Sequence, residues 1–230
     1  MTSPTSGIIF DGVSHTFGER AVLRDIHLQI TEHRVGIVGA NGSGKSTLAR
    51  MINGLVTPTE GAVRVRGLDV AKQAREVRRL VGFIFTNPDN QIVMPTVQED
   101  VAFSLRRRGL TPGDVTVRTA AALERFGLSA HADHPAHRLS GGQKQLLALA
   151  AVLVGEPVIL VADEPTTLLD ARNARRMGEL MRELTQQLIV VTHHVELLDD
   201  FDRVLVLDEG RVVADDVPAR ALEEYRALLA

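Results

Sequence analysis

The sequence predicts an α/β protein with a mainly parallel core sheet, an antiparallel β subdomain and an inserted helical subdomain. Apolar strands alternate with helical segments after Pro157, which is the pattern of a parallel sheet covered by helices. A glycine-rich turn joins a strand to a helix at residues 39–44. Residues 87–155 instead contain helices and loops, so they are expected to form a lobe inserted between strands of the sheet.

Composition limits the possible functions. The 230 residues are 44% hydrophobic and 24% charged, which is enough for a sizeable core. A net charge of −3 does not favour nucleic acid or an anionic membrane surface as a partner. The lack of cysteine excludes disulfides, thiolate metal sites and cysteine nucleophiles. The longest apolar run, Leu146–Val154, is about half of the ~18 residues that span a bilayer. We therefore expect a cytoplasmic protein whose membrane association depends on a partner.

Each element has a local signal in the sequence. Residues 1–6 are expected to be a flexible tail, residues 7–214 one domain, and residues 215–230 a short C-terminal helix. Apolar runs bounded by turn residues predict strands at 8–13, 26–30, 34–38, 62–66, 80–85, 158–161, 188–192, 204–207 and 211–214. Helical periodicity and capping residues predict helices from Lys45 and at 97–107, 114–126, 140–154, 170–184, 195–199 and after Pro218.

The glycine-rich turn has the spacing G-x4-G-K-[ST] between its strand and its helix. Its glycines allow backbone N–H groups to converge on phosphate oxygens, and the helix N-terminus adds positive potential. Lys45 supplies a charge to the outer phosphates, and the Ser46 hydroxyl is a hard ligand for Mg²⁺. The alternative is a glycine-rich turn that carries a lysine by chance, but the strand before the turn and the helix after it argue against this. The pattern predicts binding of a nucleoside triphosphate by Gly39, Asn41, Gly42, Gly44, Lys45, Ser46 and Thr47.

Two acids end the apolar strand that begins at Val158. Asp163 at the strand tip is expected to hold Mg²⁺ together with Ser46. Glu164 is then placed to orient or deprotonate an attacking water. A solvated acidic turn is the alternative, and this pair alone does not exclude it.

A second glycine-containing helix start is the most informative motif. Leu139 precedes Ser140-Gly141-Gly142-Gln143, in which a Ser N-cap and two glycines open an amphipathic helix. One nucleotide does not need two such cradles in one subunit. With these motifs in this order, Gly7–Ala214 resembles the ATP-binding-cassette (ABC) ATPases. In that family this motif caps the γ-phosphate held by the opposite subunit.

The resemblance implies roles for further residues. Asp170 is similar to the acid of the loop that joins the two active sites, and His193 to the switch histidine that contacts the γ-phosphate. His194 stands where many members carry Asp, so the role passes to His193 alone. Phe17 matches the aromatic residue that stacks on adenine, although it could equally be a core residue.

One position departs from the family. Most members carry Gln after the strand at 80–85, where it touches Mg²⁺ and senses the membrane partner, but this chain has Thr86. Its shorter hydroxyl cannot span the same gap, which implies a bridging water or a looser coupling. Gln91, five residues later, is not in register to replace the glutamine that the family carries at position 86.

The segment after Thr86 resembles the energy-coupling factor (ECF) type of vitamin and metal-ion importers. In that type Asn-Pro-Asp-x-Gln and the following acidic helix start face a groove that receives a coupling helix of a transmembrane scaffold protein. Asp89, Glu99 and Asp100 would suit arginines of such a helix, or they could simply stabilise a helix N-terminus. The chain is short after Gly210 and carries Ile-Phe-Thr-Asn-Pro at 84–88 and Gln-Ile-Val-Met-Pro at 91–95. In these features it most resembles ATPases of biotin importers, and cobalt or nickel import is the nearest alternative.

Two other groups of residues, one of histidines with an aspartate and one of arginines, are expected to have structural roles only. Four potential metal ligands lie in a Pro-containing loop without cysteine or strict spacing: His131, Asp133, His134 and His137. The run Arg106–Arg108 ends a predicted helix, where cations complement the helix dipole.

The resemblance as a whole implies a magnesium-dependent ATPase at the cytoplasmic face of the membrane. Two chains would sandwich two ATP molecules, as a homodimer or as a heterodimer with a sister ATPase. The expected partners are the scaffold and a substrate-binding membrane subunit, with no nucleic acid. A soluble ABC protein outside transport is the alternative, but such relatives usually carry coiled-coil insertions or two cassettes. A regulator that binds ATP without turnover would leave Glu164 idle.

Overall fold

The computed structural model describes residues 7–106 and 108–229, so the expected tail at 1–6 and Arg107 lie outside the described residues. The chain folds into two compact units. The first contains the described residues up to Val81, the strand Ile159–Asp163 and the described residues from Gln186 on. The second contains Gly82–Val158 and Glu164–Thr185, so it extends beyond the lobe expected at 87–155.

An antiparallel sheet opens the first unit. Its strands are paired in the order β2-β1-β4-β5 and comprise β1 (Ile8–Phe17), β2 (Arg20–Ile30), β4 (Glu60–Val65) and β5 (Leu68–Asp69). Alternate side chains such as Ile8, Phe10 and Val63 are buried, as the period of two predicts. β1 pairs antiparallel with both of its neighbours, β2 and β4.

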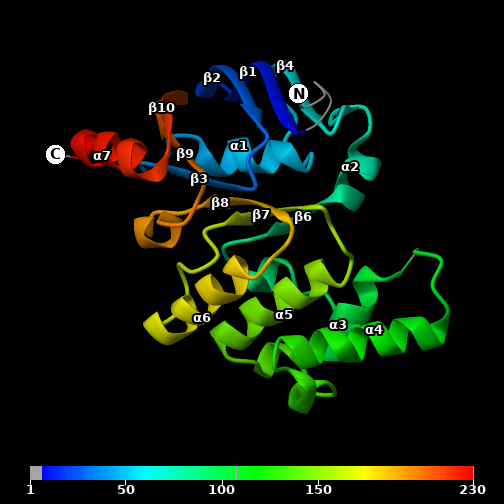
Figure 1. Ribbon diagram of the computed structural model, residues 1–230. Helices are drawn as coiled ribbons and strands as arrows, with labels where there is room; N and C mark the ends of the chain where they lie inside the picture. Colours follow the sequence, from blue (N-terminus) through cyan, green and yellow to red (C-terminus); the bar gives the residue numbers. More distant parts are fainter. Residues whose placement is uncertain (1–6, 107, 230) are drawn as a thin grey trace. The chain divides into compact units, whose positions relative to one another are not determined.

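The core strands of the first unit are mainly parallel, as predicted. They run in the order β10-β9-β3-β8-β7 and comprise β3 (Arg34–Gly39), β7 (Ile159–Asp163), β8 (Gln187–Val191), β9 (Arg203–Asp208) and β10 (Arg211–Asp216). β9, β3, β8 and β7 are parallel, and β10 is antiparallel to β9. Helix α1 (Lys45–Ile52) lies between these strands and the antiparallel sheet (Figure 1) and buries Leu48, Met51 and Ile52.

A charge network joins β2, β9 and β10. Arg203 donates to both carboxylate oxygens of Asp215 at 2.5 and 2.6 Å, to Glu32 at 3.0 Å and to the Gln29 carbonyl at 2.7 Å. Hydrogen bonds with Asp215 and then Glu32 raise the pKa of Arg203 against the effect of burial. Burial alone would raise the pKa of Glu32, but hydrogen bonds from its own backbone, Thr31 and Arg203 lower it. The guanidinium fork therefore ties three strands together.

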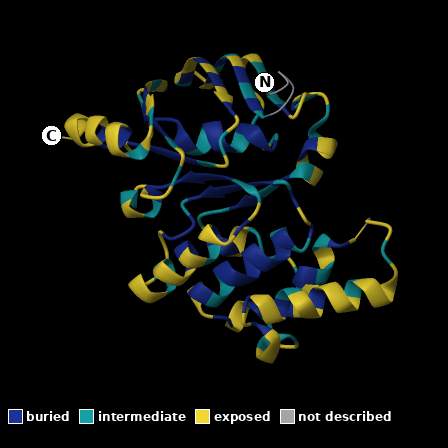
Figure 2. Cartoon of the chain, in the orientation of Figure 1, coloured by how far each residue is buried: buried dark blue, intermediate teal, exposed yellow. Residues whose placement is uncertain are grey.

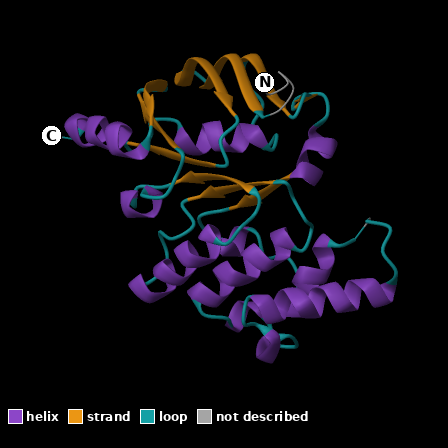
Figure 3. Ribbon diagram, viewed as in Figure 1, coloured by secondary structure: helices purple, strands orange, loops and turns teal. Residues whose placement is uncertain are grey.

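The second unit is mostly helical (Figure 3). It is entered through β6 (Val81–Ile84), and its helices are α3 (Val97–Ser104), α4 (Pro112–Arg125), α5 (Gly141–Leu153) and α6 (Ala171–Arg182). α5 packs against both α3 and α4. Because α5 is apolar on nearly every face, it forms the core of this unit, whereas α4 exposes its outer face (Figure 2).

The structure corrects several predicted boundaries. The helix predicted at 97–107 ends at Ser104. Residues 195–199 form only a 3₁₀ turn, Val195–Leu198, because so short a segment cannot nucleate an α-helix without wider packing. Sequence reasoning missed α2 (Ala74–Leu80), which buries only Val77, and Leu80 ends this helix instead of starting a strand. The last helix, α7 (Pro218–Leu228), follows Pro218 as predicted.

Candidate nucleotide-binding site and signature helix

The phosphate loop, Gly39–Ser46, joins β3 to α1. Gly39 has φ +151°, and a Cβ there would lie 2.1 Å from the Leu207 carbonyl oxygen. Gly44 has φ +104°, and its Cβ would lie 2.7 Å from the Val22 carbonyl oxygen. Side chains at these positions would push the loop away from the neighbouring backbone. α1 starts without a side-chain cap, so its N-terminus suits an external anion.

Lys45 lies inside this loop. Its Nζ donates to the carbonyl oxygens of Gly39 and Ala40, both at 2.8 Å, and the residue is 7% exposed. The loop thus holds the ammonium group beside its own backbone N–H groups, where positive charge favours phosphate.

Two hard oxygen atoms meet where β7 ends. The Ser46 hydroxyl donates to Asp163 Oδ1 at 2.7 Å, and Asp163 is fully buried. Arg50 Nη2 donates to Asp163 Oδ2 at 3.1 Å, so the buried carboxylate has a counter-charge. This donor set suits Mg²⁺. Sequence reasoning missed Arg50, although its i,i+4 spacing from Ser46 places both on one face of α1.

Glu164 follows Asp163 in the chain and begins the second segment of the helical unit. Its φ of +54° is unusual for a residue with a side chain. Its Oε2 accepts a hydrogen bond from the Thr167 hydroxyl at 3.0 Å. Backbone and hydroxyl together orient this carboxylate.

The two histidines after β8 lie against each other, with 4.2 Å between their ring centroids, but they have different surroundings. His193 is exposed, whereas His194 Nδ1 lies 3.3 Å from Glu196 Oε1. His194 also donates its backbone N–H to the Thr192 hydroxyl at 2.9 Å. His194 is thus held by local polar contacts, and the more exposed His193 packs against its ring.

Phe17, at the end of β1, is 56% exposed, so the alternative that it is a core residue is wrong. Its ring packs edge-to-face with His15, with 4.5 Å between the ring centroids. One face of an exposed aromatic ring is a suitable platform for a base.

The signature segment, Ser140–Gln143, starts α5 with a complete capping box. Ser140 Oγ accepts from the Gln143 N–H at 3.3 Å, and Gln143 Oε1 accepts from the Ser140 N–H at 2.9 Å. A Cβ on Gly142 would lie 2.6 Å from the Asn173 side chain, whereas one on Gly141 would have no neighbour within 3.8 Å. Steric crowding within the chain thus accounts for Gly142 only.

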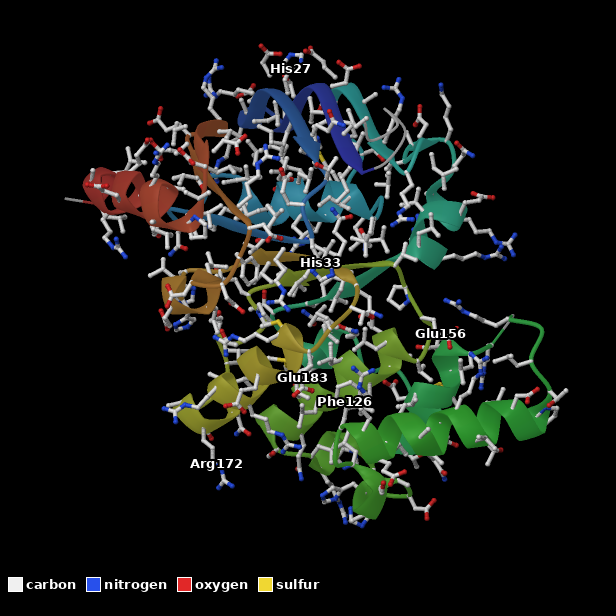
Figure 4. All side chains as sticks on the ribbon, viewed as in Figure 1. His27, His33, Phe126, Glu156, Arg172 and Glu183 are labelled. Carbon is white, nitrogen blue, oxygen red and sulfur yellow. The ribbon has the colours of Figure 1, made fainter. Side chains whose placement is uncertain are left out.

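Asp170 caps α6. It accepts hydrogen bonds from the backbone N–H of Asn173 at 2.8 Å and from its side-chain amide at 2.9 Å. The amide of Asn173 faces Gly142, so it connects Asp170 with the signature segment. Sequence reasoning missed Asn173, because no motif marks this position. Arg172, in the first turn of α6, points outward (Figure 4).

The backbone before Thr86 is held by two glutamines. Gln91 Oε1 accepts from the Phe85 N–H at 3.3 Å, and its Nε2 donates to the Ala148 carbonyl at 3.2 Å. Gln145 Nε2 donates to the Phe85 carbonyl at 3.4 Å. Gln91 therefore has a structural role next to Thr86 and does not replace it.

The three acids expected to face a coupling helix have partners within the chain. Asp89 pairs with Lys144 at 2.6 Å, and Glu99 completes the capping box of α3. Asp100 is 3% exposed and accepts from the N–H groups of Val93 and Met94 at 2.8 and 3.0 Å. Burial raises the pKa of Asp100, although these two hydrogen bonds oppose the shift. Asp100 is thus a structural carboxylate.

The fold and the phosphate loop define a P-loop ATPase. A family model described as ABC transporter matches residues 23–167, and the chain belongs to this family. It is an ATP-binding subunit that hydrolyses ATP. No helix within residues 7–106 and 108–229 has both the length and the apolar character to cross a membrane.

The chain is similar to full-length relatives. It is 46% identical over 223 residues to the biotin transport ATP-binding protein BioM of Rhizobium etli, covering 97% of this chain and 99% of that protein. The structure of cbiO1 from Clostridium perfringens, part of the transporter complex cbiONQ, has TM-score 0.83 and 30% identity, with 97% and 93% of the chains covered. The ATP-binding cassette MJ0796, a dimer bound to ADP and Pi, has TM-score 0.82 and 29% identity, with 92% and 98% covered.

Proposed function

We propose that this chain is the ATPase subunit of an energy-coupling factor importer for a vitamin. Biotin is the proposed solute, because two of its relatives are named biotin transport ATP-binding proteins. Its similarity to BioM extends over nearly the full length of both chains. A cobalt importer is the alternative, since the chain is also 41% identical to the cobalt import protein CbiO of Syntrophus aciditrophicus over 212 residues. The ATPase chemistry is the same in both cases, because an ATPase does not contact the solute.

The observation that carries the proposal is the pair of helix N-termini at α1 and α5. The uncapped α1 and Lys45 suit the phosphates of the chain's own ATP. A Cβ on Gly141, at the start of α5, would meet only the Leu168 carbonyl oxygen, at 3.9 Å, so crowding within the helical unit does not require this glycine. A close approach by a phosphate from a second subunit explains this glycine. We therefore propose a dimer in which each phosphate loop is covered by the other subunit's signature segment.

Within this dimer each residue has a defined task. Lys45 and the loop N–H groups bind the β- and γ-phosphates, and Ser46 and Asp163 would hold Mg²⁺, which would supply Lewis-acid stabilisation of the phosphate charge. Glu164 orients the attacking water and accepts its proton, and His193 contacts the γ-phosphate. Phe17 stacks on adenine, and Asp170 joins the two sites through the loop before α6.

A groove between α3 and α4 is the proposed docking place for the scaffold's coupling helix. Its cavity of about 350 Å³ is lined by apolar residues that include Ala102, Val115 and Leu123. Thr119 also lines it, and within the described part of the chain its buried hydroxyl has no hydrogen-bond partner. Glu99 adds negative charge at the wall, which suits a basic helix. The chain would thus sit at the cytoplasmic face of the membrane.

The experiment is a mild-detergent pull-down of the tagged chain from its native membranes, with co-purifying proteins identified by mass spectrometry. The proposal predicts a polytopic scaffold protein and a small substrate-binding membrane protein. Radiolabelled biotin and cobalt binding to that complex then separates the two solutes. Recovery of soluble partners or nucleic acid alone would overturn the transport assignment and leave the ATPase intact.

A further inference from the structure

A chain of hydrogen bonds leads into the signature segment from the 3₁₀ turn Ser129–His131, which is separated from that segment by a second 3₁₀ turn, Ala136–Arg138. Gln143 Nε2 lies 2.9 Å from His131 Nε2, and His131 Nδ1 lies 3.0 Å from His134 Nδ1. No group of three or more His, Cys, Asp or Glu side chains suited to a metal ion occurs in the described residues. His131 thus contacts both Gln143 and His134, and the three side chains form a hydrogen-bond network.

The Ser140 N–H determines which atom donates and which accepts in every hydrogen bond of this network. The Ser140 N–H can only donate, so the Gln143 atom that it meets is the oxygen Oε1. The amide nitrogen Nε2 of Gln143 must therefore face His131 and donate to it. His131 Nε2 accepts, which places the proton of the neutral ring on Nδ1. That N–H donates to His134 Nδ1, so His134 carries its own proton on Nε2.

We infer that His131 is a positioning residue for ATP hydrolysis, acting through Gln143 on the signature segment; this inference rests on the proposed function of that segment. The capping box alone leaves the Gln143 amide free to rotate away from Ser140. The bond to His131 fixes the amide plane, with its oxygen on Ser140 and its nitrogen on the imidazole. The N-terminal turn of α5 is thereby pre-ordered before a phosphate arrives.

The test compares steady-state hydrolysis by the full chain carrying His131→Leu with the same chain carrying His131→Gln. Leucine has no acceptor for the Gln143 amide, and kcat is expected to fall about three- to tenfold, the effect of one lost hydrogen bond. KM for ATP should stay within about twofold, because the proposed contacts to the chain's own nucleotide come mainly from the first unit. Glutamine retains an acceptor oxygen and should restore kcat to within about twofold. His137→Leu, an exposed histidine of the same loop, is the matched control and should behave as wild type.

A double-mutant cycle tests whether His131 acts through Gln143. In a Gln143→Ala background, His131→Leu should have no further effect on kcat. Additive losses, an unchanged kcat in His131→Leu, or a His131→Gln variant as impaired as His131→Leu would each overturn the inference. Ser140→Arg separates this from the proposed function. If Ser140→Arg abolishes hydrolysis but His131→Leu does not lower kcat, only the inference about His131 fails. If Ser140→Arg leaves hydrolysis unchanged, the role of the signature segment fails.

Discussion

The N-termini of α1 and α5 both begin next to glycine, but they are built in opposite ways. α1 follows Gly44 in a left-handed conformation and has no side-chain cap. α5 follows Ser140 and is closed by a capping box with Gln143. The first N-terminus needs a ligand to satisfy its N–H groups, and Lys45 adds the charge to attract one. At the second, the capping box occupies the N–H groups of Ser140 and Gln143, so a phosphate presented by another subunit would meet those of Gly141 and Gly142.

The largest effect is expected for Glu164→Gln, which distinguishes ATP binding by the first unit from the hydrolysis step that Glu164 assists. Glu164→Gln removes the proton acceptor, so kcat is expected to fall about 10²- to 10⁴-fold while ATP affinity changes little. Steady-state phosphate release and fluorescent-nucleotide binding measure the two quantities. Glu183→Gln, an exposed acid at the end of α6, is the matched control (Figure 4). A wild-type rate no higher than that of Glu164→Gln would mean that Glu164 is idle.

The next largest effects are expected at the two glycines of α5. Their alanine variants distinguish a glycine needed for folding from one needed for contact with another subunit. Gly142→Ala places a methyl group against Asn173, so the free energy of unfolding should fall by about 1–3 kcal/mol. Gly141→Ala meets no atom within 3.8 Å, so stability should be unchanged or about 0.5 kcal/mol higher. Its ATPase rate should nevertheless fall at least about tenfold, if a phosphate of another subunit approaches there. Denaturant unfolding and hydrolysis are measured on both variants, and a fully active Gly141→Ala contradicts the proposed dimer.

Arg50→Met tests how the first unit stabilises its buried acid. Asp163 would keep its bond from Ser46 but lose its arginine, and we expect a loss of about 1–2 kcal/mol, limited because Arg50 is partly exposed. ATP with Mg²⁺ supplies positive charge near Asp163, so the loss should shrink when both are present. Thermal unfolding with and without them measures this difference. Equal losses in both states would mean that Arg50 acts only in packing.

Thr86→Gln tests whether the segment held by Gln91 and Gln145 couples to hydrolysis. ATP affinity should stay nearly intact because the phosphate loop is unchanged, and kcat should change by a few fold as the longer amide reaches farther than the hydroxyl. Nucleotide titration and phosphate release are compared for the variant and the wild type. An unchanged rate would remove Thr86 from the coupling path.

Asp100→Asn should have the smallest effect. Because burial raises the folded-state pKa of Asp100, the folded protein binds its proton more tightly than the unfolded chain. This contribution to stability is fully present below the unfolded pKa of about 4 and is lost as pH rises through the folded pKa. Asparagine keeps an oxygen for Val93 and Met94, so at pH 7 the variant should be equally stable or up to about 1 kcal/mol more stable. Urea unfolding from pH 3 to 7 should show a reduced pH dependence, and a large loss at pH 7 would contradict this account.

The sequence predicted the fold and the local geometry of the motifs wherever a short segment determines them. The phosphate loop and the Ser140 cap are local patterns, and both formed as expected. Contacts that depend on distant segments were missed. The pairing of Arg50 with Asp163 joins residues 113 positions apart. His131 lies 12 residues before Gln143 in a cluster of potential metal ligands, and the sequence did not predict its hydrogen bond to Gln143.

The most direct test of the central claim uses the lack of cysteine in this chain. One sample of Glu164→Gln chain carries Asn41→Cys in the phosphate loop, and another carries Ser140→Cys in the signature segment. The two are mixed with ATP and Mg²⁺ and then oxidised, and disulfide-linked dimers are resolved by non-reducing electrophoresis. The account predicts a dimer that requires both cysteines and ATP. Formation of no such dimer, or of the same amount without ATP, would contradict a site shared between two copies of this chain.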